Sequence, residues 1–342
     1  MSPASLAIHW TRSQPSCVLA VMQHTRRWFV RGLAVAPFAT ATIAAARRRI
    51  FEVPDEATRL AAIGSLARIP AKLHPAFTPG PDDIPVPAPH ASDWLANHPD
   101  EGQTYAQFVK DRQHKPTATR RTISVKPLGK LDAAAPLATI MDFAARFFML
   151  PVARRLSSPI ASLKPTIRMN DGRRQYLTPS VIDALIPFVP ADAYCMIAVT
   201  MDDLYPHEDW NFVFGEARFH DRVGVYSFAR YDPAFYGEAH VAGTKNLILR
   251  RCLKLMVHEI GHMFAMGHCI HYACVMNGSN HLEETDRSPL HLCPVCLRKL
   301  HSSIEFDVAE RERKLAEFFR DEGLIPEAEV SERRLARLVA AG

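Results

Sequence analysis

Residues 258–268 read HEIGHMFAMGH, and they close a longer segment with helical periodicity. The spacing of apolar residues predicts a helix over residues 249–264 with one face in the core. The residues on that face are Leu249, Leu253, Met256, Ile260 and Met263. His258 and His262 are four residues apart, about 40° around a helix that turns about 100° per residue. Both imidazoles therefore leave the same face, which predicts two ligands for one metal ion.

Glu259 and His268 complete this candidate site. Glu259 directly follows the first histidine and projects beside the pair, where it could accept a proton from water at the metal without being a ligand. His268 stands beyond Gly267, where a chain leaving the helix could return to offer a third nitrogen. Three neutral imidazoles leave a fourth position open for water, as in catalytic zinc sites. An H-E-x-x-H motif alone can arise by chance, but this combination predicts a zinc metallopeptidase with Glu259 as general base.

Four cysteines follow the histidines as two close pairs, Cys269-x4-Cys274 and Cys293-x2-Cys296, separated by 18 residues. This spacing is suited to tetrahedral thiolate coordination of a structural zinc ion. Disulfides are the alternative, although cysteines two residues apart form strained bridges and more often act as ligands or redox groups. A thiol-based metal store or redox protein would use the cysteines but leaves the three histidines unexplained.

Composition limits the remaining possibilities. The 342 residues are 48% hydrophobic and 23% charged, which is ordinary for a folded globular protein. The net charge of +5 comes from residues 1–51, which hold seven arginines and no acidic residue. The remaining 34 basic residues face 36 acidic ones, so the body has no charge excess for phosphate backbones. We therefore expect no nucleic-acid partner.

Residues 25–46 resemble a bacterial twin-arginine export signal. Arg26 and Arg27 match the arginine pair, a mildly apolar run follows, and Ala44 and Ala46 could form a cleavage site. The true start could then be Met22, and the mature protein would be periplasmic. A mitochondrial transit peptide and a cytoplasmic protein remain the alternatives. The apolar run is too short and too weakly hydrophobic for a confident membrane span, and no other segment approaches that length.

Four regions are expected along the chain. Residues 1–46 are a leader, and residues 47–92 are an arm or linker with seven prolines between positions 70 and 90. Residues 93–302 are the catalytic domain, and residues 303–342 are a helical segment, with an amphipathic helix over 304–320 that docks on the body. In the catalytic domain we expect strands at 122–128, 194–200, 210–217 and 223–231, and helices at 134–149 and 180–186. The fold class is α+β.

Together these motifs resemble the archaemetzincins, whose signature joins H-E-x-x-H-x-x-G-x-x-H/N to C-x4-C-x-M and a later C-x-x-C. The matching stretches are HEIGHMFAMGHC, CIHYACVM and CPVC. Further segments look like vertebrate members of this family, so that the resemblance covers residues 90–318. These segments are Asp203–Pro206, Trp210–Gly215, Ser227–Tyr231 and Gly278–Glu284.

The resemblance implies a metzincin-like domain with a twisted mixed sheet, a long active-site helix and a Met-turn that places Met276 beneath the histidines. It also implies two zinc ions per chain, the catalytic one and a structural one on the four cysteines. The implied activity is aminopeptidase-like or narrow hydrolysis of small peptides. If the strand at 210–217 lies at the cleft edge, it could hold substrate as an added strand. A non-catalytic zinc-dependent peptide-binding protein is the alternative, but it would have no need of Glu259.

One position departs from the signature. The glycine that follows the second histidine in the family is Ala265 here. Because a left-handed helix end favours glycine, we expect the helix to continue slightly and to turn at Gly267 instead. Such a shift would move His268 relative to the other two histidines.

Overall fold

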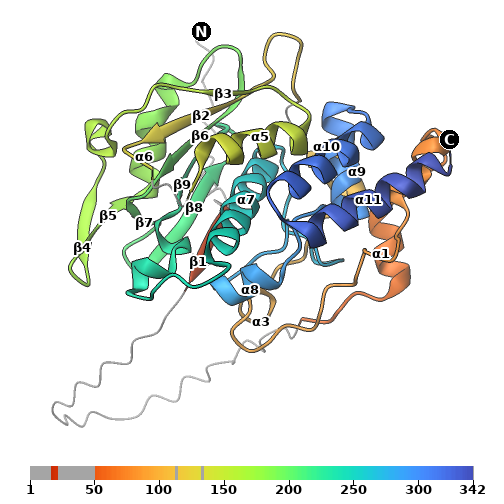
Figure 1. Cartoon of the computed structure of the whole chain (residues 1–342), viewed down its shortest axis with the longest axis horizontal. Helices are drawn as coiled ribbons and strands as arrows, with labels where there is room; N and C mark the ends of the chain where they lie inside the picture. The colour runs from red at the N-terminus through yellow and green to blue at the C-terminus, as the bar shows by residue number, and fades with distance from the viewer. Residues whose placement is uncertain (1–16, 22–50, 112–114, 132–134, 342) are drawn as a thin grey trace, which may run out of the picture.

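The computed structural model describes residues 17–21, 51–111, 115–131 and 135–341 (Figure 1). The twin-arginine segment, including Arg26, Arg27, Ala44 and Ala46, and the alternative start Met22 lie outside these residues, so the leader remains a prediction. No helix in the described ranges combines the length and the apolar character needed to cross a membrane.

A mixed nine-stranded sheet forms the centre of the molecule, which confirms the predicted α+β class. Strands β2, β3, β6 and β9 run parallel, whereas β8 is antiparallel to β9 and to β7. In spatial order the strands are β3 (Val152–Arg154), β2 (Thr122–Leu128), β6 (Ala193–Thr200), β9 (Val223–Ser227), β8 (Phe212–Arg218), β7 (Asp203–Tyr205), β5 (Arg173–Leu177) and β4 (Ile167–Asn170). Strand β1 (Cys17–Val21) pairs with β8 in antiparallel orientation.

Strand β6 is the centre of the core, and all eight of its residues are buried. Its side chains alternate between two hydrophobic clusters, with Ile197 and Val199 in one and Met196 and Ala198 in the other. Helices α5 (Leu137–Phe148) and α7 (Thr244–Met263) belong to the first cluster, and α6 (Thr178–Leu185) belongs to the second. Burial on both faces explains why this strand is a continuous apolar run.

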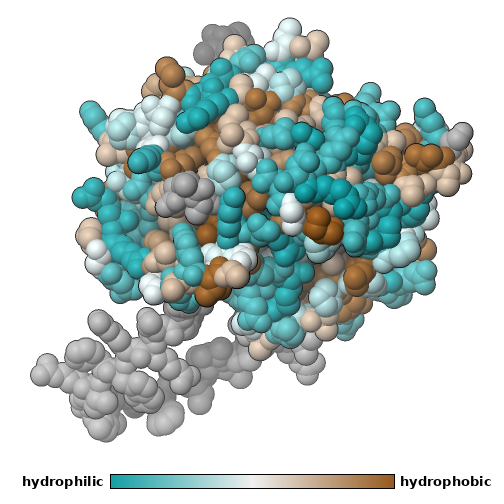
Figure 2. All heavy atoms as spheres, in the orientation of Figure 1, coloured by the Kyte–Doolittle hydropathy of each residue, from teal (hydrophilic) through white to brown (hydrophobic). Residues whose placement is uncertain are grey.

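The remaining α-helices come from both sides of the catalytic segment in the sequence. In chain order they are α1 (Glu56–Ile63), α2 (His74–Phe77), α3 (Trp94–Asn97), α4 (Tyr105–Asp111), α8 (Leu282–Arg287), α9 (Pro294–Ile304), α10 (Val308–Asp321) and α11 (Ile325–Val339). Figure 1 shows α9, α10 and α11 packed together beside α7. Hydrophilic side chains cover most of the face drawn in Figure 2, and hydrophobic ones lie among them in separate spots.

Most of the expected elements are present with small changes at their ends. The strand expected at 223–231 is too long, because β9 ends at Ser227 and a 3₁₀ turn follows at 229–231. The amphipathic helix expected at 304–320 is present as α10, but it begins four residues later, at Val308, because α9 ends at Ile304. Glu305 has a left-handed φ of 61° between them, which separates the two helices.

The proline-rich stretch lies against the body of the protein. Ala273 donates a backbone hydrogen bond to the carbonyl of Ile84 (2.8 Å), and Val86 donates one to His271 (3.3 Å). The Asp83 carboxylate pairs with Arg334 of α11 at 2.6 Å. Residues 83–86 thus connect the C-terminal helices to the loop that carries the first cysteine pair.

Candidate catalytic metal centre

Three histidines meet at the C-terminal end of α7. His258 and His262 lie on the last turns of the helix, and His268 lies on the loop after it. All three side chains are buried, and a ligand nitrogen from each lies within 4.8 Å of the others. The predicted residues are therefore brought together in one cluster.

Each of the three imidazoles donates its Nδ1 proton to an oxygen. The acceptor is the Val275 carbonyl for His258 (2.8 Å), the Met266 carbonyl for His262 (2.7 Å) and the Asp100 carboxylate for His268 (2.9 Å). In a neutral ring this leaves a lone pair on Nε2, the atom a metal ion requires.

The two helical histidines direct these lone pairs at one point, with their Nε2 atoms 2.9 Å apart. Burial lowers the pKa of His258 to about 3 and that of His262 well below its usual value, so both rings remain neutral. Two unprotonated nitrogens this close repel each other unless a cation lies between them. The donor set therefore fits a zinc ion.

Glu259 is fully buried beside the histidines. Neither of its carboxylate oxygens has a hydrogen-bond partner among the described residues. Burial, together with the nearby carboxylate of Glu216, raises the pKa of Glu259 well above its usual value. An unpartnered buried carboxylate is costly, so its presence here indicates a role completed by water or substrate.

Met276 packs directly beneath the active-site helix. A Cβ atom added to Gly261 would lie 2.6 Å from the Met276 sulfur. Only glycine at position 261 leaves room for this close contact. The carbonyl of Met276 accepts a hydrogen bond from Cys269 (2.8 Å), so the same segment connects the histidine and cysteine clusters.

The exit of α7 differs from the expectation. Ala265 itself adopts the left-handed conformation with φ of 62°, whereas Gly267 does not have a positive φ. Met266 donates to the Gly261 carbonyl (3.2 Å) and Ala265 donates to the His262 carbonyl (2.8 Å). These two bonds form the Schellman motif that commonly ends a helix. The expected turn at Gly267 is therefore wrong, because tertiary contacts and these bonds outweigh the cost of a left-handed alanine.

Ala265→Gly is expected to raise the free energy of unfolding by up to about 1 kcal/mol, because glycine adopts this conformation without the clash of a Cβ atom. Thermal unfolding of the metal-free protein measures the effect. Gly267→Ala is the matched control and should change little, since its added Cβ would meet Gln103 at an ordinary 3.4 Å. A large loss in the control with no gain for Ala265→Gly would contradict this assignment.

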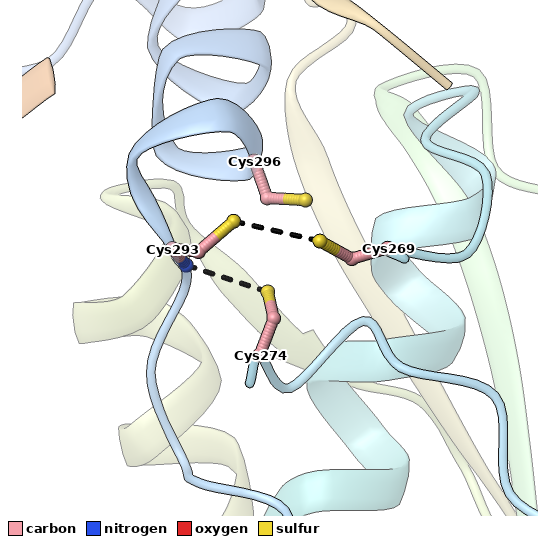
Figure 3. A group of neighbouring side chains, drawn as sticks. All are labelled: Cys269, Cys274, Cys293 and Cys296. Atoms are coloured by element: carbon pink, nitrogen blue, oxygen red, sulfur yellow. Dashed lines mark hydrogen bonds between the residues drawn. The ribbon is translucent and has the colours of Figure 1, made fainter. Parts of the chain in front are cut away.

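The four cysteines form a second cluster beside the first. Their sulfur atoms come from the loop after α7 and from the start of α9, and all four converge within 4.8 Å of one another (Figure 3). All are buried. Cys269 directly follows His268, so the two clusters share one segment of chain.

The four cysteines form no disulfide in this structure. The sulfurs of Cys269 and Cys293 are 3.6 Å apart, far from the ~2.05 Å of a disulfide, and all four cysteines are free. The Cys274 sulfur accepts backbone hydrogen bonds from Met276 (3.5 Å) and Cys293 (3.3 Å). Four convergent sulfurs with N–H donors are suited to a tetrahedral metal ion.

Two residues near these clusters were absent from the expected set. Asp100 accepts a hydrogen bond from His268, although 168 positions separate the two residues in the sequence. Asn277 accepts from the Cys274 amide (2.7 Å) and donates to the Cys269 carbonyl (2.6 Å), which holds the first cysteine pair in place. No local pattern marks Asp100, whereas Asn277 belongs to the turn-like Met-Asn-Gly segment that follows the first cysteine pair.

Known proteins resemble this chain across much of its length. The family model for Peptidase family M54 matches residues 190–302. Archaemetzincin-2 from Homo sapiens is 35% identical over 284 residues, which span 73% of this chain and 78% of that protein. Archaemetzincin-1 from Homo sapiens is 30% identical over 254 residues, 65% of this chain and 51% of that protein. The crystal structure of archaemetzincin from Archaeoglobus fulgidus complexed with malonate is 29% identical and covers 52% of this chain and 99% of that chain, with a TM-score of 0.42.

Proposed function

The chain belongs to the archaemetzincin family of zinc metallopeptidases, and on this premise we propose that it hydrolyses small peptides in an aminopeptidase-like way, with Glu259 as general base. The family matches confirm the resemblance that the motifs predicted. They also confirm the enzyme class, a zinc-dependent hydrolase. In our proposal His258, His262 and His268 hold the catalytic ion. The four cysteines hold a second, structural one.

The proposal rests on the buried Glu259 carboxylate, which has no hydrogen-bond partner among the described residues. It lies next to three histidines whose Nδ1 atoms are all hydrogen-bonded to oxygens. A bound zinc ion supplies Lewis acidity, which polarises the peptide carbonyl and acidifies water. Glu259 accepts the proton of the attacking water and then delivers it to the leaving amine. The surrounding burial keeps bulk water from competing for that proton.

The outer edge of β8 supports extended binding of the substrate. Strand β1 already pairs there in antiparallel orientation, from Cys17 opposite Ala217 to Val21 opposite Phe212. This edge therefore accommodates an added strand. The ring of Phe219, just after β8, lies 5.8 Å from that of His262. A peptide bound in place of β1 would run beside the histidines, with affinity from main-chain hydrogen bonds.

Hydrolysis of a mixed library of short peptides by the zinc-loaded protein tests this function. We expect loss of the N-terminal residue from free peptides and little cleavage of N-acetylated ones. A chelator and His262→Ala should both abolish turnover, and added zinc should restore the chelated enzyme. A chain that begins at Met22 should have a lower KM, because the β8 edge is then open. Cleavage that persists in His262→Ala would refute the proposal.

A further inference from the structure

The loop that carries His268 is held by a segment that lies far upstream in the chain. We propose that residues 94–103 position this third ligand, with Asp100 setting the orientation of its imidazole and Gln103 fixing its backbone. This inference rests on the proposed function, in which His268 is a zinc ligand. It makes residues 94–103 a part of the metal centre.

Asp100 is itself rigidly placed. Its Oδ2 atom accepts hydrogen bonds from His268 Nδ1 (2.9 Å) and from the Trp94 indole (3.0 Å), and its Oδ1 atom accepts one from the Gly102 amide (3.0 Å). Only 17% of its side chain is exposed. With three donors on one carboxylate, the imidazole has one preferred plane and one tautomer.

Trp94 packs against the His268 ring as well as bonding to Asp100. The two rings meet edge to face with centroids 5.0 Å apart, and the indole stacks on His98 at 3.8 Å. The backbone amide of Trp94 donates to the Glu284 carboxylate (2.9 Å). An added Cβ at Gly278 would lie 2.6 Å from the indole, so only glycine leaves room for it there. The indole is therefore anchored on the segment after the Met-turn.

Gln103 holds the backbone between the helix and His268. Its side chain donates to the Ala265 carbonyl (3.2 Å) and accepts from the Gly267 amide (3.0 Å). One amide group thus bridges both sides of Met266. These bonds stabilise the left-handed Ala265 and fix the direction in which the chain approaches His268.

The helical histidines need no such support, because His258 and His262 are fixed by one rigid helix. His268 lies on a loop, where backbone and ring would otherwise lose conformational freedom on metal binding. A carboxylate that accepts from the distal nitrogen of a ligand histidine also strengthens that ligand. Residues 94–103 therefore hold the loop in place before metal binding and increase the basicity of His268.

Asp100→Asn tests this role through the affinity of the histidine site for metal. The variant keeps the size of the side chain but removes its charge and one acceptor. Competition with a chelator, with the cysteine site loaded, should give affinity about 10- to 100-fold weaker than in the parent. The visible spectrum of Co²⁺ at the histidine site should also shift, since the third ligand is reoriented.

Asp93→Asn is the matched control. This carboxylate anchors the start of the same segment through Arg287 (2.7 Å) and His281 (3.1 Å) but is bonded to none of the three ligand histidines. It should leave the metal affinity and the Co²⁺ spectrum unchanged. Trp94→Phe keeps an aromatic ring but removes the N–H donor to Asp100 together with part of the indole, and it should give a smaller loss than Asp100→Asn. This variant keeps the test decisive if Asp100→Asn does not fold.

The outcomes separate this inference from the proposed function. Unchanged affinity and spectrum in Asp100→Asn and Trp94→Phe, with normal metal binding in the parent, would overturn the positioning role alone. An equal loss of metal affinity in Asp93→Asn would also overturn it, since docking of residues 94–103 would then account for the whole effect. A parent protein whose metal is unaffected by His262→Ala would overturn the proposed function and this inference together.

Discussion

Glu259→Gln should bind zinc at the histidine site as tightly as the parent and lose on the order of 10²- to 10⁴-fold in kcat. Glutamine has the same shape but cannot accept the proton from the attacking water. Since the Glu259 oxygens make no hydrogen bond with the described residues, the substitution breaks no hydrogen bond among them. Metal content and steady-state kinetics on a peptide cleaved by the parent measure the two effects separately.

Stability provides an internal check on the Glu259 variant. Burial raises the pKa of this carboxyl group in the folded protein, so the folded state is penalised once pH rises above the usual glutamate value. Metal-free Glu259→Gln should therefore be at least as stable as the parent at neutral pH, and the difference should shrink as pH falls toward ~4.3. Glu283→Gln, on an exposed carboxylate that pairs with Arg287 at 3.5 Å, should change neither turnover nor stability. Parental turnover in Glu259→Gln would end the general-base mechanism.

Local sequence patterns were sufficient for the parts of the site that lie on one element. The 3.6-residue periodicity of the segment around residue 256 predicts α7, and the four-residue spacing of His258 and His262 then places both rings on one face. The apolar run at 194–200 predicts the central strand for a similar reason, because burial on both faces leaves no polar position. These predictions need no knowledge of distant residues.

Other features depend on contacts between remote segments. The short strands β4 and β7 have too few residues to show an alternating pattern, and β5 begins with two arginines. Asp100 looks like an ordinary surface residue until the fold brings it to His268. At Ala265 the local preference for glycine predicted a later turn. The Schellman hydrogen bonds and the bond from Gln103 to the Ala265 carbonyl stabilise the earlier turn and outweigh that preference.

Alanine at both Cys293 and Cys296 is expected to remove one of two zinc ions and to lower the midpoint of thermal unfolding severely. Cys293 precedes the first residue of α9, and Cys296 lies in its first turn, so these sulfurs attach the helix to the loop after α7. Structural zinc contributes about 10–16 kcal/mol of apparent binding free energy in small zinc domains. That is comparable to the whole stability of a typical domain, about 5–15 kcal/mol.

The same loss should reach the catalytic ion, because Cys269 directly follows His268 in the chain and its backbone amide donates a hydrogen bond to the Met276 carbonyl. Elemental analysis of the parent should give two zinc ions per chain, and the double variant should hold at most one, bound more weakly. Cys252→Ala is the matched control: this buried thiol lies on α7 outside the cluster, so its loss should leave both ions in place. The structural site would be disproved by a parent that contains one zinc ion and oxidised Cys269, Cys274, Cys293 and Cys296, since convergent sulfurs would then serve disulfide exchange rather than metal binding.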